Sequence, residues 1–185
     1  MCFNVVPVKI SCEGGTKQIT TCAFLDGGSN ATFCLESLVQ ELGLKDIRPT
    51  SFTMTTTNHE KERSGYEVQL NIESLEGDAK FQISYVLTTP NLPVTRRHVA
   101  TEEDLRRWLY FYDDSLPDTG DGRVTIILIG RDCPAIIDKQ LDKRKGQHAE
   151  PIVIKTPLGG PSMVPLVMLL KVVFMSTSPA QRKRD

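Results

Sequence analysis

The chain has 185 residues, of which 22 are lysine or arginine and 23 are aspartate or glutamate, so its formal net charge is −1. This length suits one domain with a substantial hydrophobic core, and the balanced charge argues against the broad basic surface of a nucleic-acid-binding domain. The first residues show no basic segment followed by an apolar one, so we expect no secretory signal and a cytoplasmic location by default. The longest apolar run, 163–175, contains Pro165 and Lys171 and is too short to span a membrane comfortably.

Cysteines and histidines are scattered along the chain without the spacing of a metal site. The five cysteines form no Cys-x-x-Cys pair, and no metal-ligand spacing joins them to the three histidines. We therefore expect reduced cysteines, no metal and no cofactor. The cysteines are Cys2, Cys12, Cys22, Cys34 and Cys133.

Two strands are predicted first in chain order, and the second leads into an acidic turn. Residues 5–10 alternate between two faces, and residues 19–25 form a second, more apolar strand. Asp-Gly and Gly-Gly pairs are common in β-hairpin turns, so an ordinary hairpin is one interpretation of the turn. The residues of the turn are Asp26, Gly27, Gly28, Ser29 and Asn30.

The sequence after this turn predicts a helix instead of a returning strand. Apolar residues recur at the positions i, i+3, i+4 and i+7 of a helix, and Gly43 is placed to end it. We therefore interpret the acidic turn as a loop that holds one carboxylate at the end of a strand. The apolar positions of the helix are Leu35, Leu38, Val39 and Leu42.

Residues 50–73 predict a hairpin with a polar tip. Its second strand, 66–73, alternates between apolar and polar side chains, and the polar stretch 57–65 separates it from the first strand. The tip, with Asn58 and His59, is either a flap that covers a substrate or an ordinary surface hairpin. We expect His59 to be exposed rather than catalytic, because the sequence supplies no acid to orient it.

A strand at 81–87 comes next, and residues 94–122 then have the character of an insertion. Thr101 can cap a helix whose apolar face is formed by four side chains. The loop after that helix holds a second acidic triplet, but no buried strand precedes it to fix the carboxylate. The helix face consists of Leu105, Trp108, Leu109 and Tyr112, and the triplet is Asp118, Thr119 and Gly120.

Residues 124–129 are apolar on both faces and predict a central, buried strand. The strand ends at Gly130, Arg131 and Asp132. Asp132 is placed to cap a short helix that has Pro134 in its first turn. We expect a solvated loop at 138–149 and a last strand at 151–156.

Three of these segments resemble aspartic proteases. Residues 23–33 resemble the Leu-Asp-Ser/Thr-Gly-Ser/Ala segment of that class, and residues 127–132 resemble its second hallmark, an apolar pair and a glycine followed by Arg-Asp or Arg-Asn. The resemblance is to the retropepsin-like domain of BEL/Pao-type retrotransposon polyproteins. It also covers residues 151–159 and in all spans most of residues 5 to 159.

The resemblance implies a mostly-β fold, a single-lobe acid-protease barrel with two or three short helices. It also implies an aspartic-type endopeptidase that cleaves a peptide or polyprotein substrate as a homodimer, with Asp26 from each subunit. Gly28 would donate from its N–H to the carboxylate, Ser29 would hydrogen-bond an outer oxygen, and Arg131 would brace the active-site loop. We expect neither a nucleic acid nor a membrane as a partner.

Two departures from the family keep other interpretations open. Gly27 stands where active relatives carry Ser or Thr, and after Gly159 the match stops, so that residues 160–185 are either an added strand, a frayed end or a foreign segment. A catalytically weak or inactive domesticated remnant that binds proteins or dimerises is the main alternative. An unrelated β-rich binding domain is the third possibility.

Overall fold

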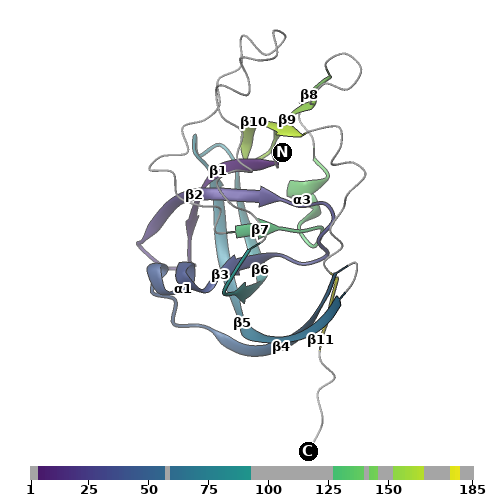
Figure 1. Ribbon diagram of the computed structural model, residues 1–185. Helices are drawn as coiled ribbons and strands as arrows, with labels where there is room; N and C mark the ends of the chain where they lie inside the picture. Colours follow the sequence, from purple (N-terminus) through teal and green to yellow (C-terminus); the bar gives the residue numbers. More distant parts are fainter. Residues whose placement is uncertain are drawn as a thin grey trace, which may run out of the picture.

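The structure is a computed structural model that describes residues 4–56, 59–92, 127–139, 142–145, 152–164 and 176–179. In this part of the chain the fold is mostly β, with two short helices (Figure 1). The strands are β1 (Val5–Ser11), β2 (Gln18–Leu25), β3 (Phe33–Leu35), β4 (Arg48–Thr56), β5 (His59–Ser74), β6 (Lys80–Thr89), β7 (Ile127–Ile129), β8 (Asp142–Lys145), β9 (Ile152–Thr156), β10 (Gly159–Val164) and β11 (Ser176–Pro179). The helices are α1 (Glu36–Leu42) and α3 (Pro134–Ile137).

The main sheet closes on itself. It has eight strands in the order β1-β2-β7-β3-β6-β5-β4-β11, and β1 also pairs with β5. The strands from β1 to β5 in this order therefore form a ring, while β4 and β11 extend from it as a curved ribbon (Figure 1). A smaller sheet has the order β10-β9-β8.

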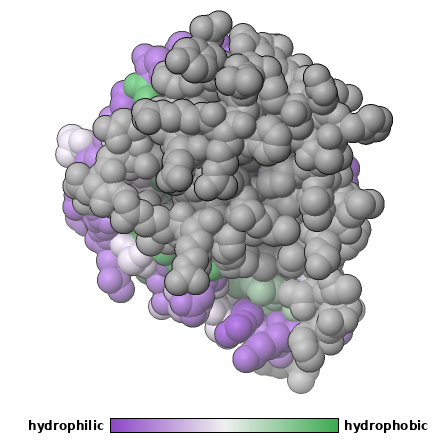
Figure 2. All heavy atoms as spheres, turned by 45° about the horizontal axis from the view of Figure 1, so that its top comes forward, coloured by the Kyte–Doolittle hydropathy of each residue, from purple (hydrophilic) through white to green (hydrophobic). Residues whose placement is uncertain are grey.

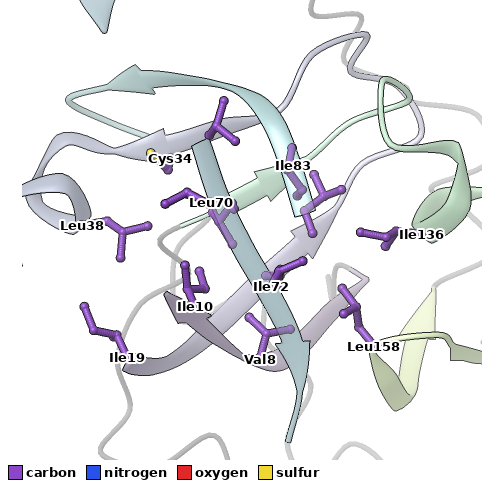
Figure 3. Packing of buried hydrophobic residues seen from close by; sticks show 14 of the residues in the cluster. Val8, Ile10, Ile19, Cys34, Leu38, Leu70, Ile72, Ile83, Ile136 and Leu158 are labelled. Atoms are coloured by element: carbon purple, nitrogen blue, oxygen red, sulfur yellow. The ribbon is translucent and has the colours of Figure 1, made fainter. Parts of the chain in front are cut away.

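Alternating side chains fill the inside of the ring. Ile10 of β1, Leu70 and Ile72 of β5, and Leu38 of α1 are fully buried and belong to one hydrophobic cluster (Figure 3). Burial of each such side chain contributes roughly 1.5–3 kcal/mol relative to its exposed state. A second cluster around Phe33 lies on the other face of the sheet, where its ring packs against Phe52 at a centroid distance of 5.8 Å.

Several elements predicted from the periodicity are confirmed. The two N-terminal strands, the second of which leads into the acidic turn, are β1 and β2. Of the buried strand predicted over 124–129, residues 127–129 form β7, and 124–126 lie outside the described residues.

Helix α1 buries Leu38, Val39 and Leu42 as predicted, but Leu35 ends the short strand β3 and precedes the helix. The helix ends at Gly43, which has a φ of 67°. This left-handed conformation suits glycine, because it has no Cβ atom.

The prediction of a long polar tip in the hairpin is wrong. Strand β5 begins at His59, and Thr56 pairs with His59 while Phe52 pairs with Arg63. The polar residues 59–65 therefore belong to the ladder, because backbone pairing with β4 does not require apolar side chains on a strand that faces solvent. Only residues 57 and 58 separate the two strands, and Asn58 lies outside the described residues.

Strands also form within the predicted loop 138–149 and within the divergent segment 160–185. Residues 142–145 form β8 and pair with β9, so the prediction of a loop over 138–149 is wrong for these four residues. Beyond residue 159, β10 pairs with β9 and β11 pairs with β4, so parts of the divergent segment add strands. The predicted helix after Thr101 and the triplet at 118–120 lie outside the described residues.

The described surface is largely hydrophilic in the view of Figure 2, with small hydrophobic areas between polar ones. Among the described residues, no helix is both long and apolar enough to cross a membrane.

Thr21 is a polar exception inside the hydrophobic ring. It is 1% exposed, lies between Ile19 and Ala23 on the inner face of β2, and pairs with Val8 of β1. Its hydroxyl oxygen has no hydrogen-bond partner in the described part of the chain. A buried hydroxyl without a partner destabilises the folded state by about 1–3 kcal/mol.

Replacing Thr21 by valine should therefore stabilise the protein. The methyl group that replaces the hydroxyl has nearly the same size, and the lost polar group removes an uncompensated desolvation penalty. We expect the free energy of unfolding to rise by about 1 kcal/mol in urea denaturation. The matched variant Thr20→Val, at an exposed position of the same strand, should change it by less than about 0.5 kcal/mol. Equal effects of the two variants would contradict this explanation.

Candidate active site

Asp26 follows directly on the buried strand β2 and is held at its backbone and its side chain. Its N–H donates to the carbonyl oxygen of Ile129 in β7, at 2.9 Å. One carboxylate oxygen, Oδ1, accepts a hydrogen bond of 2.9 Å from the N–H of Gly28. The turn is closed by the N–H of Ser29, which donates to the carbonyl oxygen of Asp26 at 3.1 Å. The expected contact from Gly28 to the carboxylate is thus present.

Partial burial changes the acidity of Asp26. Loss of solvent around the carboxyl group raises its pKa above the ordinary value of 3.8, and backbone N–H groups of Gly28 and Ser29 oppose this rise without cancelling it. Desolvation disfavours the charged form of a carboxyl group, whereas hydrogen bonds to the carboxylate favour it. Asp26 is therefore a carboxyl group whose protonated form persists to higher pH than in an exposed aspartate.

The second hallmark segment lies beside the first. Strands β2 and β7 are parallel, with Leu25 opposite Ile129, so both strands end at the same edge. Strand β3, which follows the acidic loop, pairs antiparallel with the other side of β7. The segments 26–32 and 130–133 therefore meet although about a hundred residues of sequence separate them.

Thr32 joins the two segments through its hydroxyl and its N–H. The hydroxyl donates to Oδ1 of Asp132 at 2.7 Å and accepts from the N–H of Gly130 at 3.1 Å. The N–H of Thr32 donates to Oδ2 of the same Asp132 carboxylate at 2.9 Å. Both oxygens of Asp132 are thus directed at one residue of the acidic loop. This role of Thr32 was not predictable from the sequence, because a threonine at the start of a strand has no distinctive pattern.

Asp132 does not cap the helix α3, so that prediction is wrong. The residue before the helix is Cys133, and it makes no side-chain capping hydrogen bond. The carboxylate of Asp132 turns to Thr32 instead, where two donors are available. Pro134 stands in the first turn of α3 as predicted, where its missing N–H is not needed.

Ser29 and Arg131 contact the loop in ways that differ from the expectation. The buried hydroxyl of Ser29 donates to the carbonyl oxygen of Ala31 at 2.7 Å, not to the carboxylate of Asp26. The N–H of Arg131 donates to the carbonyl oxygen of Ser29 at 2.8 Å, while its side chain is exposed. Arg131 therefore joins the loop through its backbone. Asn30 is exposed at the turn.

The two glycines at the centre of the site have opposite surroundings. A Cβ atom at Gly130 would lie 2.5 Å from the carbonyl oxygen of Ala31 and 2.9 Å from that of Ser29, so only glycine permits this approach. A Cβ atom at Gly27 would meet only Cγ2 of Ile137, at 3.9 Å. The fold thus requires glycine at 130 and leaves room for a side chain at 27.

The candidate flap residues are not brought to the site by any described contact. His59 is the first residue of β5, and Asn58 lies outside the described residues. Among the residues described, no three histidine, cysteine, aspartate or glutamate side chains are grouped to hold a metal ion.

Comparisons with known proteins add no relative. No family model, no curated protein and no solved structure matches the chain.

Replacing Gly130 by alanine should destabilise the protein, because the new methyl group would displace the backbone of the acidic loop. We expect a loss of about 1–3 kcal/mol in the free energy of unfolding, measured in urea. Gly27→Ala is the matched variant in the same site. It should leave the free energy unchanged or raise it by up to about 1 kcal/mol, since alanine restricts the unfolded chain. A Gly130→Ala variant as stable as Gly27→Ala would refute the close approach of the two segments.

Proposed function

We propose that this protein is an aspartic-type endopeptidase that acts as a homodimer, with Asp26 of each subunit in one shared site. The observation that carries the proposal is the Asp26 carboxyl group itself. It stands at the end of a buried strand and is half-buried. It accepts a hydrogen bond from the backbone N–H of Gly28, which fixes its orientation. Such a fixed, partly desolvated carboxyl group is typical of an acid or base in catalysis.

The chemistry requires two such groups. Two carboxyl groups that face one water molecule cannot both be charged at close distance, so they share a proton and titrate as a pair. The ionised member takes a proton from the water as it attacks the peptide carbonyl, and the protonated member donates to the carbonyl oxygen. The pKa of Asp26 is raised even in a single chain, and this favours the protonated form that one member of the pair must have.

Two-fold symmetry would supply the second carboxyl group. Gly27 is exposed and Asp26 half-buried, so the loop is accessible to a second copy of itself. A two-fold axis places the same loop of both subunits opposite each other. The peptide substrate would then lie between the paired loops and the β4–β5 hairpins, which extend beyond the ring of strands (Figure 1).

The adjacency of the two hallmark segments supports membership of the retropepsin-like domains. In those domains we expect the Asp-Gly loop and the Ile-Gly-Arg segment to support each other, and here they share the hydrogen bonds of Thr32. A polyprotein of a BEL/Pao-type retrotransposon is the substrate and the ancestry that this resemblance suggests.

A second candidate function, a binding or dimerisation domain without activity, is favoured by Gly27. Active relatives carry a hydroxyl there that ties the two loops across the dimer axis. A hydrogen bond of this kind contributes about 1 kcal/mol for each subunit. Since the backbone leaves room for a side chain at position 27, the missing hydroxyl is a property of the sequence and not a requirement of the fold.

Cleavage of a diverse peptide library, at mildly acidic and at neutral pH, tests the proposal. The protein must be concentrated enough to populate a weak dimer. Replacing Asp26 by asparagine should reduce the rate of cleavage by about 10²–10⁴-fold or more, because asparagine can neither take nor give the proton. Circular dichroism and sedimentation of both proteins provide the control for folding and association.

The possible results separate the two candidates. Cleavage by the wild type that the Asp26→Asn variant lacks would support the aspartic mechanism. Folded dimers of both proteins that cut no peptide would reject the enzyme and favour the binding domain. Cleavage at equal rates by both would mean that another group performs the chemistry.

A further inference from the structure

The structure contains a second peptide-sized feature outside the Asp26 loop, a groove between β6 and α3. It has a volume of about 550 Å³ and is lined by residues 81–85 of β6 and residues 132–136. Ligand pockets in proteins have volumes of about 300–1,000 Å³, so the groove has room for several side chains.

One wall of the groove is the edge of a strand. On one side, β6 pairs with β5 from Lys80 to Ile83 and again at Val86 and Leu87, and the register of the pairing shifts between these two stretches, at Ser84 and Tyr85. On the opposite side, β3 pairs only with residues 87–89 of β6. In the part of the chain that the structure describes, the edge of residues 81–85 therefore lacks a neighbouring strand. Backbone N–H and C=O groups on such an edge are a template for another extended chain.

The floor of the groove is apolar. Ile83 of β6 and Ile136 of α3 come from facing elements and are 5% and 2% exposed, and Ile136 points from the helix toward the sheet (Figure 3). The half-buried ring of Phe81 and the exposed ring of Tyr85 mark the two ends of the strand segment. Tyr85 is 46% exposed although it is large and aromatic. An apolar side chain could be buried between these groups.

The charge of the groove is negative. Asp132 is the one charged residue among those that line it, and it is exposed at the end of the wall formed by residues 132–136. Thr32 donates two hydrogen bonds to the carboxylate of Asp132. A carboxylate offers about four acceptor positions, so about two of them remain for a ligand. A basic side chain would therefore be attracted to this end of the groove.

We propose that this groove binds an extended peptide segment of a protein partner, which adds as a strand to the edge of β6 that has no neighbour among the described residues and which carries alternating apolar and basic side chains. The backbone of the peptide would pair with residues 81–85, as in other cases of strand addition. Side chains on one face of an extended chain alternate with those on the other, so apolar residues would enter the groove at every second position. The groove shares Asp132 with the segment that supports the Asp26 loop, but Asp26 does not line it and binding there does not depend on peptide hydrolysis.

The test uses the full chain with Asp26 replaced by asparagine, so that hydrolysis cannot consume the peptide. The probe is a fluorescent peptide of alternating valine and lysine. One control peptide has glutamate in place of lysine, and another has two prolines at its centre, which remove N–H donors. Fluorescence anisotropy measures the affinity, and hydrogen exchange measures the protection of each backbone amide.

We expect the valine–lysine peptide to bind about tenfold or more tightly than either control. It should also slow exchange of those amides in residues 81–85 that point away from β5. Ala135→Arg and Ser84→Arg, which place a long cationic side chain on opposite walls, should each weaken binding at least about tenfold. The matched variant Gln40→Arg, on the exposed side of α1, should bind like the parent.

Three results would overturn the proposal. One is equal binding of all three peptides, or no binding. Another is unchanged affinity in both Ala135→Arg and Ser84→Arg. The third is protection, before any peptide is added, of those amides in residues 81–85 that point away from β5, because another segment of this chain or a second copy would then already occupy the edge.

Discussion

The geometry of the candidate site depends on one hydrogen-bonded residue, Thr32. Its hydroxyl and N–H connect the acidic loop to the segment after β7, through Asp132 and Gly130. Each of these bonds is buried or partly buried, so water would replace them poorly if Thr32 were absent. Hydrogen bonds to a charged group contribute about 1.5–3 kcal/mol. Without this connection, the backbone bonds from Asp26 to Ile129 and from Arg131 to Ser29 would remain, but no side chain of the acidic loop would hold Asp132 and Gly130.

The closed ring of strands makes this connection possible. Pairing of β1 with both β2 and β5 closes the ring, and β7 lies between β2 and β3. Closure brings the chain from residue 129 back to the acidic loop, and glycine at position 130 allows the two backbones to approach. As a result, the buried ring of strands holds the half-exposed carboxyl group of Asp26 in a fixed position. A rigid framework that presents a partly desolvated acid at the surface suits a site that is completed by a second subunit.

Periodicity in the sequence was sufficient to predict most of the framework, but not the short strand β3 between the acidic turn and α1. The alternation in β1 and β5, the helical spacing in α1 and the all-apolar β7 reflect which faces are buried, and burial follows directly from side-chain polarity. The polar strand over residues 59–65 and the strand β8 could not be predicted in this way. Their pairing depends on backbone hydrogen bonds to a neighbour, and those bonds carry no signal in the side chains.

The candidate site was predictable in part for the same reason. The motif assigns a role to each of its positions. It therefore predicted the site carboxylate of Asp26, the hydrogen bond from Gly28 to that carboxylate, and the glycine at position 130. The contacts of Ser29, Thr32 and Asp132 depend on which donors and acceptors the closed ring brings together across about a hundred residues, and sequence spacing does not reveal this. Asp132 shows the difference: its sequence position indicates a helix cap, while the structure offers it the stronger pair of donors on Thr32.

We propose that Asp26 is a partly desolvated acid that pairs with its counterpart in a second subunit. Titration of its carboxyl carbon by ¹³C NMR, at low and at high protein concentration, is the decisive measurement. We expect one pKa above the ordinary value for aspartate in the dilute monomer. In the concentrated protein we expect two separated titration steps, because the paired groups share a proton. A single titration at or below the ordinary value, unchanged by concentration, would rule out the pairing.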